Sequence, residues 1–321
     1  MQSGTHLRPS TSTLTRSEPR GKPQPEVVAV DVTAGHHSGV SPRRLLTWDE
    51  IPEWCRDDEF VRTGYRPISR SARKSFASLF YMHNETINIL THLLPAIASL
   101  LSGWYIVQSY LDQKYPDLKF SDYVVFGFFF LSATCCLGLS AAYHALCNHS
   151  FPVASLWLRV DLVGIVVLTL GDFVSGIYVG FWCEPFESIG LLGNVGTASI
   201  FIMLSPDFEG PKWRTFRVLT FVATGLSGFV PLAHGVYLFG IPQMMKQSDM
   251  PYYLVEGLFL ILGALVYTTR VPERFSSGTF DKCGVSHQIF HVLVVLATIT
   301  QVVGILSAFD YNYHHRVCLI H

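Results

Sequence analysis

The chain has 321 residues, of which 49% are hydrophobic and only 15% are charged, and its mean hydropathy is +0.32. These values are too apolar for an ordinary soluble protein of this length, and they predict a polytopic membrane protein. The formal net charge is −1, so no global positive field favours nucleic acid, and no nucleic-acid partner is expected.

Two segments precede the apolar part of the chain. Residues 1–44 are rich in Ser, Thr, Pro and Gly, which predicts a disordered N-terminal tail without the apolar core of a signal peptide. The first span is therefore expected to serve as the insertion signal. Residues 45–88 mix aromatic and basic side chains, a pattern typical of short helices at the headgroup level. A cytosolic cap packed on the helix bundle is a compatible alternative.

Seven apolar stretches then form a predicted domain over residues 89–309. Each is close to the roughly 20 residues that a helix needs to cross a bilayer. The expected spans are 89–110, 123–146, 160–183, 188–204, 214–238, 252–270 and 286–309, of which the fourth is the shortest. Residues 310–321 are left as a short tail.

The loops predict the orientation of these spans. Basic residues are concentrated in the loops on the side of the N-terminus, which the positive-inside rule places in the cytosol. The predicted fold is therefore an all-α, seven-transmembrane helix bundle with a cytosolic N-terminus, a cytosolic juxtamembrane helical segment and an outer C-terminal tail. The glycosylation motifs at Asn84 and Asn148 fall on the predicted cytosolic side, so neither is expected to carry sugar.

The seven cysteines are scattered and form no C-x-x-C pair. Most lie in or beside apolar spans. They are expected to be small buried hydrophobic residues rather than a disulfide framework.

Three histidines are predicted at one face of the membrane. His144 lies near the end of the second span, and His287 and His291 lie near the start of the seventh. The four-residue spacing of the last two is about one helical turn, so both imidazoles share a helix face. Polar groups at this depth are costly without partners. Three imidazoles that leave a fourth position open would suit a zinc ion.

Two further polar residues fall in the same layer. Asp161 opens the predicted third span, and Ser140 lies one turn deeper than His144. Asp161 could act as a general base on a zinc-bound water, and Ser140 could orient that water. Lipid-facing walls would favour a lipid substrate. Each residue also has a simpler interpretation: an interfacial histidine, a small packing serine, or a helix N-terminal acid paired with Arg159.

The chain from about Trp48 to Phe309 resembles the progestin and adipoQ receptor family, which includes the adiponectin receptors and the haemolysin III-related proteins. The resemblance is carried by the segments 85–93, 140–144 with Asp161, 271–275, 280–281 and 286–291. It is closer to the adiponectin-receptor branch. It implies a zinc ion bound by His144, His287 and His291, with Asp161 and Ser140 near the bound water. It also implies ceramidase-like amide hydrolysis and a role in lipid and zinc homeostasis.

Other polar residues in the spans need an explanation. Asp172 differs from the receptors that the chain resembles, and an acid at mid-membrane depth predicts an interior partner or a cavity. Glu85, Asn88 and His92 form a polar cluster at the start of the first span, which is interpreted as packing against the juxtamembrane segment. His234 is interpreted as a hydrogen-bonded interior residue rather than a second metal ligand.

Three functions remain open: a zinc-dependent lipid amidase, a seven-span signalling receptor with structural zinc, and a transporter or channel. The open coordination position favours the first, because structural zinc is usually fully ligated by protein. The absence of an inverted-repeat pattern disfavours the third. The expected partners are a ceramide-like lipid or fatty acid within the bundle and an extracellular ligand of unknown identity. The expected location is the plasma membrane or an endomembrane.

Overall fold

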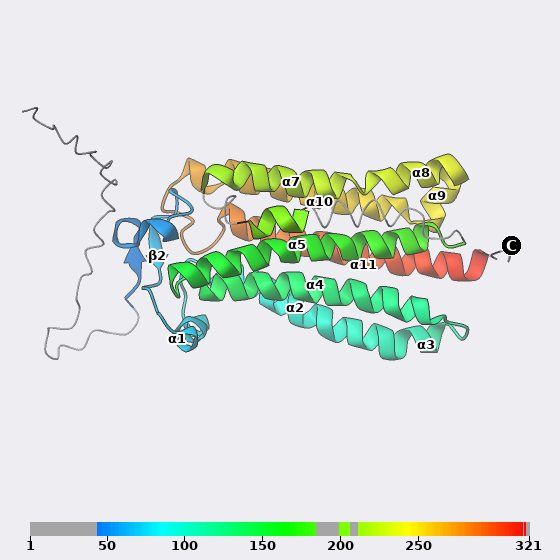
Figure 1. Cartoon of the computed structure of the whole chain (residues 1–321), viewed down its shortest axis with the longest axis horizontal. Helices are drawn as coiled ribbons and strands as arrows, with labels where there is room; N and C mark the ends of the chain where they lie inside the picture. The colour runs from blue at the N-terminus through cyan, green and yellow to red at the C-terminus, as the bar shows by residue number, and fades with distance from the viewer. Residues whose placement is uncertain (1–43, 184–198, 206–210, 317, 319–321) are drawn as a thin grey trace, which may run out of the picture. The chain divides into compact units, whose positions relative to one another are not determined.

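The computed structural model describes residues 44–183, 199–205, 211–316 and 318, and its described part is dominated by long helices that run alongside one another (Figure 1). The α-helices are α1 (Ala72–Ala77), α2 (Thr86–Tyr105), α3 (Leu111–Lys114), α4 (Phe120–Leu146), α5 (Phe151–Gly180), α7 (Arg214–Leu226), α8 (Phe229–Phe239), α9 (Ile241–Gln247), α10 (Met250–Thr269) and α11 (Ser286–His315). A short π-helix, Ile106–Tyr110, joins α2 to α3. The short strands β1 (Leu46–Thr47) and β2 (Thr63–Tyr65) pair antiparallel.

Within the described ranges, 6 helical segments are long and apolar enough to cross a membrane. They are Thr86–Lys114, Phe120–Leu146, Phe151–Gly180, Arg214–Phe239, Met250–Phe275 and Ser286–His315. Each matches one of the expected spans. Most of the remaining expected span, residues 188–198, lies outside the described residues, although 199–204 are helical. The expected count of seven therefore stays a prediction.

The helices differ from the expected spans at their ends. Helix α5 begins at Phe151, nine residues before the predicted start, with Pro152 in its first turn, where a missing N–H costs nothing. Asp161 consequently lies inside the helix, about three turns from its start. Its interpretation as a helix N-terminal acid was wrong.

Small residues set the register between α4 and α5. A Cβ added to Gly164 would lie 3.1 Å from Cys136 Cα, and one added to Gly171 would lie 1.9 Å from Ser132 Oγ. The two helices run antiparallel, so Gly164 and Gly171 meet successive turns of α4. Small residues permit this close approach of helices in lipid. The same register brings the next turn of each helix, with Ser140 and Asp161, together.

The segment before α2 packs on the end of the bundle that holds the start of α11. Ile51, Val61 and Tyr65 form a buried apolar cluster with Val285. Asp281 accepts hydrogen bonds from Arg62 N at 2.9 Å and Thr63 Oγ1 at 2.6 Å. The segment is therefore a cap on the bundle with short helices and a strand pair.

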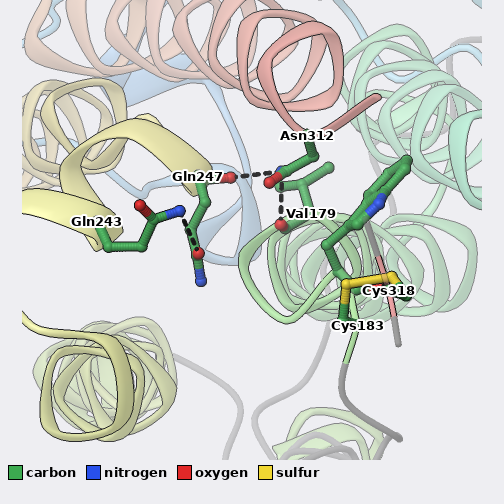
Figure 2. Close-up of a disulfide and its surroundings, with 7 residues drawn as sticks. Val179, Cys183, Gln243, Gln247, Asn312 and Cys318 are labelled. Atoms are coloured by element: carbon green, nitrogen blue, oxygen red, sulfur yellow. Dashed lines mark hydrogen bonds between the residues drawn. A yellow bond between two sulfur atoms is a disulfide. The ribbon is translucent and has the colours of Figure 1, made fainter. Parts of the chain in front are cut away.

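A disulfide joins Cys183, just after α5, to Cys318, just after α11 (Figure 2). The expectation that the cysteines form no disulfide was wrong for this pair. Five other cysteines are free. Nearby, Asn312 Nδ2 lies within hydrogen-bonding distance of Val179 O at 2.8 Å and Gln247 O at 2.7 Å, which ties α11 to α5 and α9. The bundle is thus fastened at the end opposite to the cap.

Candidate metal centre

Three histidines from two helices converge at the capped end of the bundle. His144 comes from the last turn of α4, and His287 and His291 come from the first two turns of α11. One ligand nitrogen of each lies within 4.8 Å of the others, and the ring centroids are 4.7 to 5.0 Å apart. The expected convergence of the three side chains is thus present in the structure.

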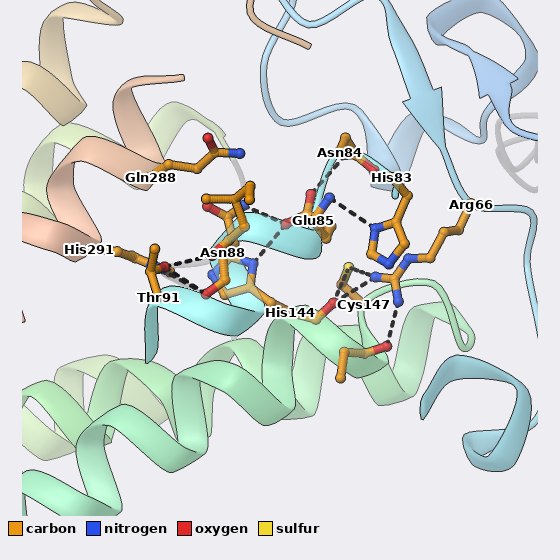
Figure 3. Close-up of polar contacts among 12 residues, drawn as sticks. Arg66, His83, Asn84, Glu85, Asn88, Thr91, His144, Cys147, Gln288 and His291 are labelled. Carbon is orange, nitrogen blue, oxygen red and sulfur yellow. Dashed lines mark hydrogen bonds and ion pairs between the residues drawn. The ribbon is translucent and has the colours of Figure 1, made fainter. Parts of the chain in front are cut away.

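The first helix of the bundle orients two of these imidazoles. His144 Nδ1 lies 2.9 Å from Glu85 Oε2, and His291 Nδ1 lies 3.2 Å from the Asn88 carbonyl oxygen (Figure 3). A ligating histidine usually donates its other ring N–H to a carboxylate or a backbone carbonyl in this way. The Nε2 atoms are then left for a metal ion. His144 Nε2 is buried and has no hydrogen-bond partner, as the donor set of a metal site requires.

Glu85 and Asn88 therefore have a more direct relation to the site than packing against the juxtamembrane segment. The sequence held one signal for this: positions 85, 88 and 92 share one face of a helix. His92 occupies the third of these positions. Its ring stacks on His291 with centroids 3.6 Å apart, and neither of its nitrogens has a hydrogen-bond partner.

The Glu85 carboxyl group, which lies just before α2, remains ionised in this setting. Burial alone would raise the pKa of Glu85, but the hydrogen bonds from His144 and Asn88 and the nearby Arg66 guanidinium hold it well below its usual range. A carboxylate partner makes the imidazole of His144 a stronger electron donor toward a metal ion.

Arg66 fixes the end of α4 that carries His144. Its buried guanidinium donates to the carbonyl oxygens of His144 at 2.6 Å and Ala145 at 2.9 Å, and to Ser78 Oγ at 2.8 Å (Figure 3). The last carbonyls of a helix have no partner within the helix. Arg66 satisfies them from the cap and so holds the backbone of His144 in place.

The start of α11 is fixed in a comparable way. Glu273 accepts hydrogen bonds from Ser286 N at 2.7 Å and from Ser286 Oγ. A carboxylate is favourable at a helix N-terminus, where backbone N–H groups have no partner within the helix. The contact lies one residue before His287.

Asp161 and Ser140 lie beside the triad. The Asp161 carboxyl group lies near the Ser140 hydroxyl and near His144, close enough to interact electrostatically with both. Both residues line one cavity together with His287 and His291. Four of the five residues expected in one layer therefore line this cavity, and the fifth, His144, lies within 4.8 Å of the two histidines that do.

The cavity has a volume of about 480 Å³ and extends from the histidines deep into the bundle. Its lining is mostly apolar, with side chains such as Phe173, Leu260 and Val294. Asp172 also lines it, so this acid faces a cavity as expected. His234 does not line it and contacts the Phe181 ring instead, with centroids 5.8 Å apart.

Comparison with known proteins places the chain in a family. The family model described as "Haemolysin-III related" matches residues 80–302. The chain belongs to the haemolysin III-related family. It is an integral, multi-pass membrane protein.

Several relatives cover most of the chain. It is 36% identical to the ADIPOR-like receptor IZH2 of Saccharomyces cerevisiae over 84% of this chain and 85% of the relative. It is 37% identical to the ADIPOR-like receptor IZH1 of Eremothecium gossypii over 80% and 82% of the two chains. It is 36% identical to the adiponectin receptor protein of Drosophila melanogaster over 86% of this chain and 62% of the relative. The resemblance to adiponectin receptors and haemolysin III-related proteins is confirmed.

Proposed function

We propose that this protein is an adiponectin-receptor-like membrane protein that binds one zinc ion through His144, His287 and His291 and hydrolyses a lipid amide bond of the ceramide type. The observation that carries the proposal is the convergence of three imidazoles, two of which line an apolar cavity together with one acid and one hydroxyl. Such a cavity admits a hydrocarbon chain, and its polar end offers the groups that amide hydrolysis needs.

The residues would divide the work as follows. A zinc ion held by the three imidazoles would act as a Lewis acid that polarises the amide carbonyl and makes water more acidic. Asp161 would accept a proton from the attacking water and return it to the departing amine. Ser140, which lies near Asp161, would orient that water. The apolar walls of the cavity would hold the acyl chain and exclude bulk water.

The proposed orientation places the N-terminus and the metal site toward the cytosol and the C-terminus outside. The distribution of basic loop residues supports it. The Cys183–Cys318 disulfide lies at the other end of the bundle, and disulfides persist mainly in oxidising compartments. A role in lipid and zinc homeostasis would follow from these properties.

A second candidate is a receptor whose zinc ion is structural and whose signal is conformational. The names of the yeast and insect relatives favour it, because each contains the word "receptor". The two candidates differ in one property of the purified protein: only the amidase would hydrolyse ceramide without a signalling partner.

One experiment tests both. Zinc content and ceramide turnover are measured on purified wild type and on His287→Ala. We expect about one zinc per wild-type chain and measurable turnover, and loss of both in the variant. Zinc without turnover in the wild type would favour the receptor. Full zinc occupancy in His287→Ala would reject the metal site.

A further inference from the structure

A second polar cluster lies in the same cavity, far from the histidines. Asp172 on α5 and Tyr253 and Glu256 on α10 line the cavity, Gln301 on α11 is buried beside them, and we call these four residues the deep subsite. Asp172 is eleven residues beyond Asp161 in one helix, which corresponds to about 16 Å at ~1.5 Å per residue. Nothing in the proposed hydrolysis uses these residues.

Among the described residues, the two carboxyl groups of the deep subsite have no cationic partner. Both line the cavity and interact electrostatically with each other. In the described ranges, neither forms an ion pair with Lys or Arg, and the segment 184–198 contains no basic residue in its sequence. Buried acids of this kind are costly unless a partner neutralises them.

The neighbouring polar atoms are also without partners. Gln301 is fully buried, and its Nε2 lies 3.4 Å from the Asp172 carbonyl oxygen, which leaves Oε1 as a hydrogen-bond acceptor. Gln301 Oε1, Asp172 Oδ1 and the Tyr253 hydroxyl are buried with no hydrogen-bond partner. The Tyr253 and Gln301 side chains lie close enough to interact with each other, whereas Asp172 Oδ1 belongs to the cavity lining and indicates a missing ligand.

The position of Tyr253 depends on a glycine. A Cβ on Gly176 would lie 2.7 Å from the Tyr253 hydroxyl oxygen, so any larger residue would displace this side chain. Tyr253 and Glu256 are three residues apart on α10 and share one helix face. Tyr253 and Glu256 are thus placed beside α5, which carries Asp172 and Gly176.

The chemistry of the cluster selects the ligand. Among the described residues, no cation neutralises the two carboxyl groups, so a ligand that carries positive charge and donates hydrogen bonds would match them. A primary ammonium has three N–H donors and one charge, which suits the carboxyl groups of Asp172 and Glu256. The rest of the cavity is apolar and large enough for a hydrocarbon chain.

We propose that the deep subsite binds the ammonium group of a single-chain cationic amphiphile whose hydrocarbon chain lies in the apolar part of the cavity. The acidic side chains would at the same time disfavour a fatty-acid carboxylate at this depth. The proposal does not depend on the zinc ion or on amide hydrolysis.

The test compares three probes with one chain length: dodecylamine, dodecanol and dodecanoic acid. Equilibrium binding is measured on the purified full chain, with no hydrolysable substrate present. We expect dodecylamine to bind saturably and at least about tenfold more tightly than the other two. Glu256→Gln should weaken dodecylamine binding at least about tenfold, since it removes one partner of a buried charge pair. Asp172→Asn gives the same test if Glu256→Gln fails to fold.

The matched control is Glu59→Gln, which removes one negative charge from an exposed position outside the cavity lining. It should leave the binding of all three probes unchanged. Equal affinities for the three probes, or equal dodecylamine binding in wild type and Glu256→Gln, would overturn the proposal. So would stabilisation by Na⁺ or Ca²⁺ that Glu256→Gln abolishes without any preference for the amine, because it would assign the subsite to an inorganic cation. None of these outcomes depends on ceramide turnover.

Discussion

The Glu85 carboxylate determines which nitrogen of His144 is available to a metal ion. His144 Nδ1 lies 2.9 Å from Glu85 Oε2, and a hydrogen bond donated by Nδ1–H leaves the Nε2 lone pair for a metal ion. Without this contact the ring could flip or change tautomer. Glu85, which is outside the triad, therefore determines whether His144 can bind a metal ion through Nε2.

We predict that Glu85→Ala will weaken zinc binding about 10- to 100-fold, which is the usual cost of losing a partner of a ligating histidine. Zinc affinity is measured by competition with a chromogenic chelator. The control Glu59→Ala removes an exposed acid and should leave the affinity unchanged. An unchanged affinity in Glu85→Ala would show that the carboxylate does not orient the ligand.

Asp161 offers a second test at the scale of one residue. We predict that Asp161→Asn will keep the zinc and lose about 10²- to 10⁴-fold in turnover, because an amide cannot accept the proton of the attacking water. Zinc content and ceramide turnover are measured on the same preparation. If zinc and turnover fall together, Asp161 is a metal ligand. Turnover equal to that of wild type would reject a catalytic role.

At the scale of helices, the contact between α4 and α5 aligns Ser140 with Asp161. The two glycines on α5 allow the backbones to approach at Cys136 and Ser132. Ser140 lies one turn beyond Cys136 on the same face of α4, at the spacing that separates Ser132 from Cys136. Helix packing several turns away therefore positions the proposed acid–hydroxyl pair.

We predict that Gly171→Ala will destabilise the protein by about 1–3 kcal/mol, because the new methyl group overlaps Ser132 Oγ in a packed interface. Thermal unfolding in detergent is the measurement. Gly138→Ala on α4, where an added Cβ has nothing within 4 Å, is the matched control and should be neutral or stabilising. The double variant Gly171→Ala with Ser132→Ala should regain part of the loss, because it removes Oγ while residue 132 Cβ stays 3.0 Å from the new methyl group. A destabilisation that Ser132→Ala leaves unchanged would rule out this contact as its cause.

The sequence predicted the existence of the helices better than their boundaries. Hydropathy located six of the expected spans, because a run of apolar residues is a strong signal. It missed the early start of α5, since the turns before Arg159 are less apolar than the membrane core. It also missed the break between α7 and α8 at Ser227–Gly228, where a Cβ on Gly228 would lie 2.6 Å from the Phe173 ring. Local hydropathy does not report such contacts.

The candidate site was more predictable than these boundaries. The topology alone brings the end of the second span and the start of the seventh to one level, which assembles the three histidines. The pairing of Glu85 with His144 and of Cys183 with Cys318 depends on side-chain positions in three dimensions. The two cysteines are separated by 135 residues, and no spacing rule connects them.

At the scale of the whole described bundle, the metal site and the disulfide mark opposite ends. His287 lies at the start of α11 and Cys318 follows its end, so a 30-residue helix of about 45 Å separates them. That length exceeds the roughly 30 Å hydrocarbon core of a bilayer. A membrane-spanning α11 would therefore place the two ends in different compartments. An oxidising compartment at the disulfide end would leave the histidine end in the cytosol.

We predict that Cys283, an exposed free thiol near the start of α11, faces the cytosol. A membrane-impermeant maleimide should not label it in sealed right-side-out vesicles and should label it once detergent opens them. Cys283→Ser gives the background. A cysteine introduced by Gln113→Cys, at an exposed position on α3 at the opposite end, should react without detergent. Labelling of Cys283 in sealed vesicles, with Gln113→Cys protected, would reverse the orientation and place the metal site on the outer side.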